Sequence, residues 1–152
     1  MSATPVLSPV RGRAVRMEDV PDPVFAQLMV GPGAAVDPPR EVVDAVAPVS
    51  GTVLKVLPHA FVILTADGLG VLVHLGIDTV TMRGDGFSLL ATEDARVEAG
   101  QPVVGWDPAY VARSGRSPMC AVVVLDQPAR ADLAHPPGSP VTAGEPVFDI
   151  AR

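Results

Sequence analysis

Two of the three histidines in this chain of 152 residues lie on either side of a predicted turn. His74 ends one apolar run and His59 precedes another, and the dipeptide Asp67-Gly68 between them predicts a β-hairpin. An imidazole can act near neutral pH as a nucleophile, a proton donor or a metal ligand. Two imidazoles on one face of a hairpin could act together. The alternative is that each is a half-buried strand residue with an ordinary hydrogen-bond partner.

The number of residues in the turn decides which side chains share a face. A two-residue turn places Phe61 opposite His74 and His59 opposite Gly76. Because side chains alternate along a strand, His59, Phe61 and His74 then lie on one face, with the histidines roughly 6 to 8 Å apart. A four-residue loop keeps this arrangement and a three-residue loop breaks it. We expect the two-residue turn.

The run VHLGIDTV at residues 73–80, preceded at this spacing by His59, resembles the active-site segment of a bacterial family. The family is the glucose-type IIA components of the phosphoenolpyruvate-dependent sugar phosphotransferase system. The resemblance extends from Ser8 to Ile150. It includes the following motifs: SPVRG at 8–12, DVPDPVFA at 19–26, MVGPG at 29–33, APVSGTV at 47–53 and GDGF at 84–87.

Composition and repeats predict an all-β fold. Seventeen prolines and fourteen glycines divide the chain into short valine-rich pieces, a pattern typical of short strands. Residues 8–15 resemble 47–54, and 97–103 resemble 141–147, which predicts two similar halves packed face to face. The expected architecture is an antiparallel β-sandwich or flattened barrel with an internal two-fold repeat and short helical segments. The resemblance implies the same fold.

We expect one domain over residues 1–152, with residues 1–6 disordered. A short helix should follow Asp107, which can cap it, and end at Gly115. The single cysteine, Cys120, should pack as a small hydrophobe in a buried strand. The stretch from 127 to 140 reads as an irregular surface connection, in which His135 is solvated and has no chemical role.

Charge and hydropathy exclude several classes of partner. The formal net charge of −6 argues against nucleic acid or an anionic membrane and favours a basic protein surface as partner. No signal peptide and no apolar run of about eighteen residues is present, so we expect a cytoplasmic protein without membrane insertion. No glycine-rich phosphate loop supports direct use of ATP.

The resemblance implies a phosphocarrier that accepts phosphate from the histidine phosphocarrier protein HPr and passes it to a cysteine of the IIB domain of a sugar permease. His74 is then phosphorylated on Nε2, and the backbone carbonyl of Gly76 orients its ring. His59 donates a hydrogen bond to the phosphoryl group, and Asp78 lies at the rim of the site or serves only turn geometry. The family's threonine two residues before the second histidine is missing here, because residues 56–58 read VLP.

A docking surface for these partners is also expected from the resemblance. The aspartate in it would attract a cationic partner and the apolar side chains would exclude water. Its expected members are Asp22, Phe25, Val30, Phe61 and Leu72.

Two alternatives remain open. The first is a mainly regulatory protein that binds and inhibits other permeases or enzymes when unphosphorylated. The second, more remote, is a zinc hydrolase, because His74 and Asp78 have the His-x3-Asp spacing of a metallopeptidase family. That family also needs a His-x-His pair, which this chain lacks. No cofactor is required, although a partner's ligand could help His59 and His74 to bind zinc.

Overall fold

The computed structural model describes residues 3–26, 31–125 and 131–151, which form short strands with a few short helices. The elements of these described residues are β1 (Ala3–Leu7), β2 (Gly12–Arg16), the 3-10 helix η1 (Met17–Asp19), α1 (Pro23–Ala26), β3 (Gly33–Asp37), β4 (Val43–Val46), β5 (Gly51–Leu57), β6 (Ala60–Leu64), β7 (Gly70–Leu75), the 3-10 helix η2 (Thr79–Met82), β8 (Phe87–Leu89), β9 (Arg96–Val97), β10 (Pro102–Trp106), α2 (Pro108–Arg113), β11 (Cys120–Val124), β12 (Ala131–Leu133), β13 (Pro140–Val141) and β14 (Pro146–Ala151).

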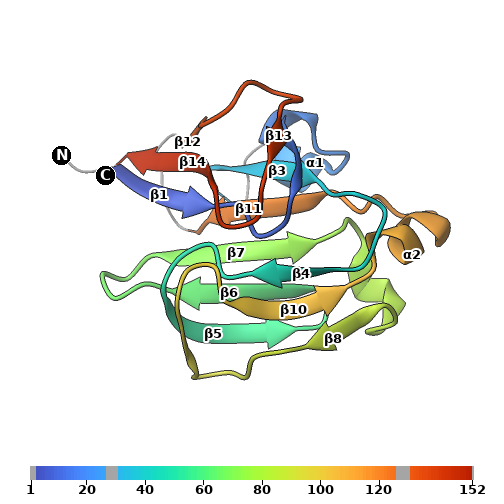
Figure 1. The fold of residues 1–152 in the computed structure, drawn as a ribbon, viewed down its shortest axis with the longest axis horizontal. Helices are drawn as coiled ribbons and strands as arrows, with labels where there is room; N and C mark the ends of the chain where they lie inside the picture. Colours follow the sequence, from blue (N-terminus) through green and yellow to red (C-terminus); the bar gives the residue numbers. More distant parts are fainter. Residues whose placement is uncertain (1–2, 27–30, 126–130, 152) are drawn as a thin grey trace.

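The strands form three antiparallel sheets in two layers, which confirms the predicted fold class (Figure 1). One layer is an eight-stranded sheet in the order β13-β2-β3-β11-β7-β6-β5-β9. The other layer consists of two three-stranded sheets, β1-β14-β12 and β4-β10-β8. The described ends of β1 and β14 lie together at one end of the molecule, and α2 lies at the other.

The repeats seen in the sequence are related by the strand pairing. Gly12 of β2 pairs with Val141 of β13, and Gly51 of β5 pairs in the same way with Val97 of β9. One half therefore contains β1–β3 and β11–β14, and the other contains β4–β10. Each half contributes strands to both layers, so the halves meet edge to edge at β7 and β11 (Figure 1). The predicted face-to-face packing of the halves is wrong, because each half already supplies a covering sheet for its own strands.

Side-chain alternation gives the eight-stranded sheet two different faces. The inner face packs against the three-stranded sheets, and its central strands contribute only apolar side chains to this core. These are Phe61 and Ile63 of β6, Val71, Val73 and Leu75 of β7, and Cys120, Val122 and Val124 of β11.

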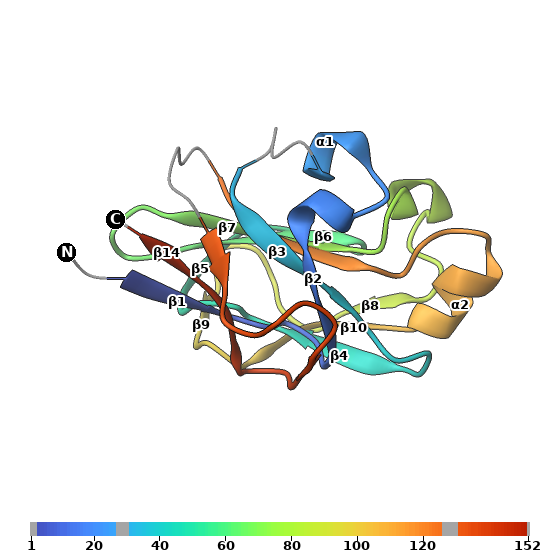
Figure 2. The same cartoon turned by 90° about the horizontal axis from the view of Figure 1, so that it is seen from above.

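The outer face of the same sheet is covered on one half by η1 and α1 (Figure 2). Met17 and Phe25 from these helices form a second buried cluster with Ala35, Ala121 and Val123 of the sheet. No buried residue of this cluster comes from β6 or from the end of β7. The fold thus leaves part of the outer face of β7 open at the strand that carries His74.

Two local predictions have clear outcomes. The side chain of Asp107 accepts a hydrogen bond from the N–H of Tyr110 at 3.2 Å and caps α2, as predicted. The predicted disorder of residues 1–6 is wrong for residues 3–6, because β1 begins at Ala3 and pairs with β14. Within the described residues, no helix is long and apolar enough to cross a membrane.

The hairpin of β6 and β7 has a three-residue loop rather than the predicted two-residue turn. The N–H of Thr65 donates to the carbonyl of Leu69 at 2.8 Å, and the hydroxyl of Thr65 accepts from the N–H of Leu69 at 2.9 Å. The loop also bends through Gly68, whose φ of 91° is left-handed. Thr65 therefore closes the hairpin one residue wider than the dipeptide Asp67-Gly68 suggested.

This difference of one residue changes the face on which Phe61 lies. Ala60 is opposite His74, and Phe61 is opposite Val73. Phe61 is only 1% exposed and packs in the inner core. The prediction that Phe61 shares a face with His74 and contacts partners is therefore wrong.

Truncation of Phe61 tests this register. We expect Phe61→Ala to lower the free energy of unfolding by about 3–5 kcal/mol, because it leaves a cavity in the core. Leu57 is 39% exposed at the end of β5, and Leu57→Ala should cost about 1 kcal/mol or less. Urea denaturation of both variants measures the difference. Equal, small losses would contradict the buried position of Phe61.

Candidate functional site

His74 lies near the end of β7 on the outer face of the eight-stranded sheet and is half-buried. Its neighbours on the adjacent strands are small, because Ala60 of β6 and Ala121 of β11 pair directly with it. Larger residues at these two positions would occupy the space beside the ring. The sequence thus gives one imidazole room on a surface that is otherwise apolar.

The backbone after β7 turns back to hold the ring of His74. Nδ1 of His74 lies 2.6 Å from the carbonyl oxygen of Gly76. A carbonyl can only accept, so Nδ1 carries the proton and the lone pair of a neutral ring is on Nε2. This is the contact expected of Gly76.

Gly76 is the residue that this turn requires. Its φ of 78° is left-handed, and a Cβ there would lie 2.6 Å from Cγ2 of Thr79 and 3.1 Å from the carbonyl oxygen of Ser117. The hydroxyl of Thr79 donates to the carbonyl of Leu75 at 2.7 Å, and the N–H of Ile77 donates to the carbonyl of Ser117 at 2.9 Å. These bonds fix the carbonyl that orients His74.

His59 lies beside His74, although not by the predicted route. It occupies the turn between β5 and β6, and its carbonyl accepts from the N–H of Leu75 at 2.7 Å. The two ring centroids are 5.4 Å apart with an interplanar angle of 67°. The predicted closeness of the histidines is confirmed, but the turn and the bond from Leu75 produce it rather than strand alternation.

Phe25 of α1 packs its ring against His74 from another side. The ring centroids are 5.4 Å apart in an edge-to-face arrangement. Phe25 is only 8% exposed and belongs to the outer buried cluster. The prediction of an exposed docking residue is therefore wrong for Phe25, which instead limits where the imidazole can move.

The other predicted docking residues are found in different situations. Leu72 is half-buried and packs against the outer cluster, which leaves it only partly available to a partner. Val30 lies outside the described residues. Asp22 is partly exposed, and its carboxylate accepts from the N–H of Val24 at 2.9 Å at the start of α1.

Asp78 lies on the other side of the site at the start of η2. It has a left-handed backbone, with φ 60° and ψ 21°, and is exposed. Asp78 follows Gly76 by two residues, and the carbonyl of Gly76 contacts the His74 ring. Asp22 directly precedes α1, whose Phe25 packs against the same ring. The negative charges of both carboxylates raise the pKa of His74.

Burial keeps both imidazoles neutral. It lowers the pKa of His74 below its usual 6.5, against the opposing effects of the Gly76 carbonyl, Asp22 and Asp78. Burial, with a contribution from His74, also lowers the pKa of His59. A neutral imidazole has one ring nitrogen with a free lone pair and one that carries a proton, so near pH 7 each ring can accept one hydrogen bond and donate another.

Three exposed apolar side chains near the site were not predicted. They are Val24 of α1 at 46%, Leu57 at 39% and Val80 of η2 at 61% exposure. α1 and η2 lie on the same side of the eight-stranded sheet (Figure 2). In the sequence, each of these apolar residues adjoins Phe25, Pro58 or Thr79, but whether its side chain is exposed depends on how the turns pack.

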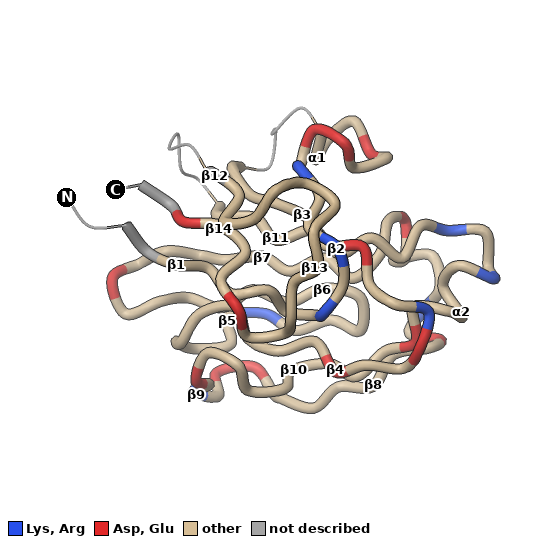
Figure 3. The backbone as a smooth tube through the Cα atoms, turned by 45° about the horizontal axis from the view of Figure 1, so that its top comes forward, with Lys and Arg blue, Asp and Glu red and all other residues tan. Residues whose placement is uncertain are grey.

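The strands around the site carry no charged side chains. No Lys, Arg, Asp or Glu occurs on β6, β7 or β11, which are tan in Figure 3.

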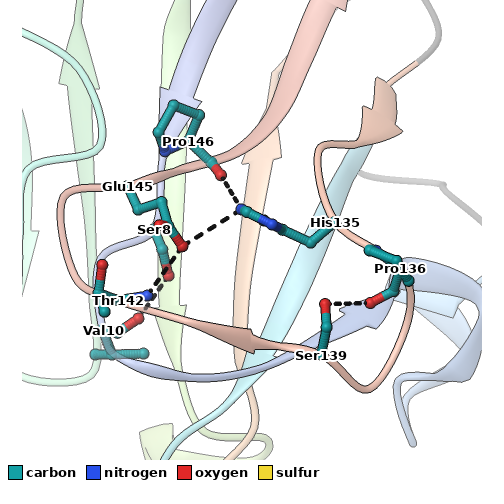
Figure 4. Close-up of polar contacts among 8 residues, drawn as sticks. All are labelled: Ser8, Val10, His135, Pro136, Ser139, Thr142, Glu145 and Pro146. Atoms are coloured by element: carbon teal, nitrogen blue, oxygen red, sulfur yellow. Dashed lines mark hydrogen bonds and ion pairs between the residues drawn. The ribbon is translucent and has the colours of Figure 1, made fainter.

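The remaining histidine and the cysteine lie elsewhere. Nε2 of His135 lies 3.0 Å from the carbonyl oxygen of Pro146 and 3.4 Å from a carboxylate oxygen of Glu145 (Figure 4). His135 is thus a partnered, half-buried residue rather than the solvated one predicted. Cys120 is buried in β11, as predicted, and burial raises the pKa of its thiol.

Comparison with known proteins identifies the group of this chain. The model of the family "phosphoenolpyruvate-dependent sugar phosphotransferase system, EIIA 1" matches residues 4–129. The chain belongs to this family.

Full-length similarity supports the membership. The solved structure of glucose permease IIA from Mycoplasma capricolum has a TM-score of 0.86 and 32% identity, covering 98% of this chain and 96% of that one. The glucose-specific EIIA component of Staphylococcus aureus is 34% identical over 148 residues, which is 95% of this chain and 88% of the relative.

Some relatives are much longer proteins. The N-acetylglucosamine-specific EIICBA component of Escherichia coli (strain K12) is 36% identical over 155 residues, covering 100% of this chain. The match covers only 24% of that relative, so this EIIA chain spans about a quarter of its length.

The two neighbouring histidines of this EIIA chain are also the expected ligands of a zinc ion. Across residues 3–26, 31–125 and 131–151, no group of three or more His, Cys, Asp or Glu is placed to hold a metal ion. His59 and His74 would supply two ligands, whereas a catalytic zinc normally has three protein ligands. Zinc at this pair would therefore need ligands from a partner.

The lowered pKa of His74 predicts how stability depends on pH. The unfolded chain binds a proton near pH 6.5, while folded His74 stays neutral to lower pH. The unfolded state therefore holds more protons in this window, and stability falls as the pH falls from 6.5 through the folded pKa. We expect His74→Gln to lose less stability on acidification than the parent chain, measured by urea midpoints between about pH 8 and about pH 5. Identical pH slopes would contradict the lowered pKa.

Proposed function

We propose that this chain is a phosphocarrier of the sugar phosphotransferase system, which carries a phosphoryl group on Nε2 of His74. It receives the group from the phosphohistidine of HPr and passes it to the cysteine of a IIB domain. The observation that carries this proposal is the 2.6 Å contact between Nδ1 of His74 and the carbonyl of Gly76. This contact leaves the lone pair of a rigid, neutral imidazole on Nε2.

In the first transfer, the lone pair of Nε2 attacks phosphorus opposite the nitrogen of the donor imidazole. The new N–P bond forms as the donor's N–P bond breaks, and the donor leaves as a neutral imidazole because its other ring nitrogen already carries a proton. The Gly76 carbonyl stabilises the positive charge that develops on the His74 ring. In the second transfer, a thiolate of the IIB domain attacks the same phosphorus and Nε2 is the leaving group.

His59 stabilises the phosphoryl group in both steps. Its ring lies 5.4 Å from that of His74, so its N–H can reach an oxygen of a phosphate on Nε2. Because burial holds His59 neutral, it donates one hydrogen bond and does not compete as a proton source. Phe25 and the fixed turn restrict the His74 ring, which reduces the reorganisation that each transfer needs.

We call the exposed apolar side chains Val24, Leu57 and Val80 the apolar rim. Together with Asp22 and Asp78, the rim would contact HPr and the IIB domain. Apolar contact excludes water from the phosphoryl group, and the two carboxylates favour a partner with cationic residues. A regulatory role for the unphosphorylated chain would use the same surface and stays a prediction.

The test of the proposed function is transfer of phosphate to His74. Incubation with phosphoenolpyruvate, the first enzyme of the system and HPr should give one phosphate per chain, labile in acid and stable in base. His74→Ala should take none, because no other side chain has the oriented Nε2. Intact-mass measurement before and after acid treatment checks this. His135→Ala is the matched control and should label fully. Label on the His74→Ala chain would contradict the proposal.

The two histidines should fail differently. In His59→Gln the nucleophile remains, so phosphorylation by HPr should persist. Onward transfer to a IIB domain should slow about a hundred- to a thousand-fold, as expected when one well-placed donor is lost. Rapid-quench measurement of each half-reaction separates the two steps. If onward transfer stays normal, the donor is not His59.

A further inference from the structure

Asp78 has a backbone conformation that is sterically disfavoured for a residue with a Cβ. Its φ of 60° and ψ of 21° are left-handed, a region that glycine adopts routinely and that aspartate and asparagine enter more often than other residues. Such a residue persists when its surroundings hold it in place, and these residues cluster at functional sites. The hydrogen bonds that hold the backbone of Asp78 therefore also determine where its carboxylate lies relative to His74.

The carbonyl oxygen of Asp78 receives three donors. The hydroxyl of Thr81 lies at 2.8 Å, Nε of Arg116 at 3.2 Å and the N–H of Thr81 at 3.4 Å. Arg116 also donates to the hydroxyl oxygen of Thr81, from Nε at 3.0 Å and from Nη2 at 2.7 Å. The guanidinium and the hydroxyl thus form one closed network around this carbonyl.

Arg116 is itself held in place from the end of α2. Its Nη1 lies 3.0 Å from the hydroxyl oxygen of Ser114, and its N–H donates to the carbonyl of Val111 at 3.3 Å. The next residue, Ser117, accepts from the N–H of Ile77. The segment after α2 therefore hydrogen-bonds to the turn after β7 through two neighbouring residues, Arg116 and Ser117.

We infer that Arg116 is a positioning residue for the transfer site: through Thr81 and the Asp78 carbonyl, it holds the carboxylate of Asp78 beside His74. The inference rests on the proposed phosphocarrier function. The side chain of Arg116 hydrogen-bonds to the turn between Gly76 and η2, and none of its hydrogen bonds within the described residues reaches a histidine.

The position of Asp78 has two consequences for the reaction. Its negative charge raises the pKa of His74, which makes Nε2 more basic. The same charge repels a phosphoryl group on Nε2 and so favours passing it on. Asp22, directly before α1, acts on the pKa of His74 in the same direction, and the neutral His59 faces the ring without a charge.

The test uses Arg116→Met and Thr81→Val, which break the network from its two sides. If Arg116 positions Asp78, both variants should lower the His74 pKa by roughly 0.2–0.7 unit, the scale of one exposed charge pair. The ratio of phosphorylated to unphosphorylated chain at equilibrium with phospho-HPr should rise about two- to fivefold, because the loss of repulsion on the phosphoryl group outweighs the smaller loss of basicity at Nε2. Asp78→Asn, which keeps the left-handed backbone and removes the charge, sets the upper limit of both effects. Histidine NMR titration and intact-mass measurement give the two readouts.

The sign of the shift separates positioning from simple charge. Loss of a cation alone would raise the His74 pKa, the opposite of the expected result. Arg113→Met is the matched control, because Arg113 lies over the Tyr110 ring at 5.8 Å, and it should change neither readout. A raised or unchanged His74 pKa in Arg116→Met, or no change in Thr81→Val, would overturn the inference. If the parent chain takes no phosphate, the proposed function fails, while the NMR titration still tests the placement of Asp78.

Discussion

The site depends on one hydrogen bond, between Nδ1 of His74 and the carbonyl of Gly76. It fixes the tautomer, the ring orientation and the atom that carries the lone pair. The bond forms only because the chain reverses at a left-handed glycine directly after β7. The segment after α2 holds this reversal, so a strand end and a distant helix end together position one carbonyl. A bulkier residue at position 76 would meet Thr79 and Ser117, and the carbonyl would have to move.

The two-fold repeat explains why the site is open. Ala60 of β6 pairs with His74 just as Gly33 of β3 pairs with Val123. Val123 thus occupies in one half the position that His74 occupies in the other. η1 and α1 cover Val123 in the outer cluster, whereas His74 is half-buried, with its ring against Phe25 of α1. The same sheet geometry therefore provides a packed face in one half and a partly open face that carries His74 in the other.

Partial burial of the site keeps the imidazoles neutral and still leaves Nε2 of His74 accessible to a partner. Burial lowers the pKa of both imidazoles and so favours their neutral forms, and a neutral ring is what the proposed phosphoryl transfer to His74 needs. Complete burial would prevent a partner from reaching Nε2. In the proposed function, a partner's surface on the exposed apolar rim would supply the missing cover during transfer, when water must be kept from the phosphoryl group. Stability and function thus make opposite demands on the outer face of β7.

The sequence by itself determined the all-β class, the repeat and the cap of α2, and it indicated that His59, His74 and Gly76 lie together. Short valine-rich pieces between prolines and glycines, and the motif around His74, are local features that composition and spacing express directly. The register of the β6–β7 hairpin was decided only by tertiary structure, because the hydroxyl of Thr65 closes a wider loop than Asp67-Gly68 predicts. The burial of Phe25 and Phe61 and the hydrogen bond from Arg116 to the carbonyl of Asp78 also depend on contacts between distant segments. Sequence spacing specifies which residues alternate, but the face that each one occupies depends on loop closure and on what packs above the sheet.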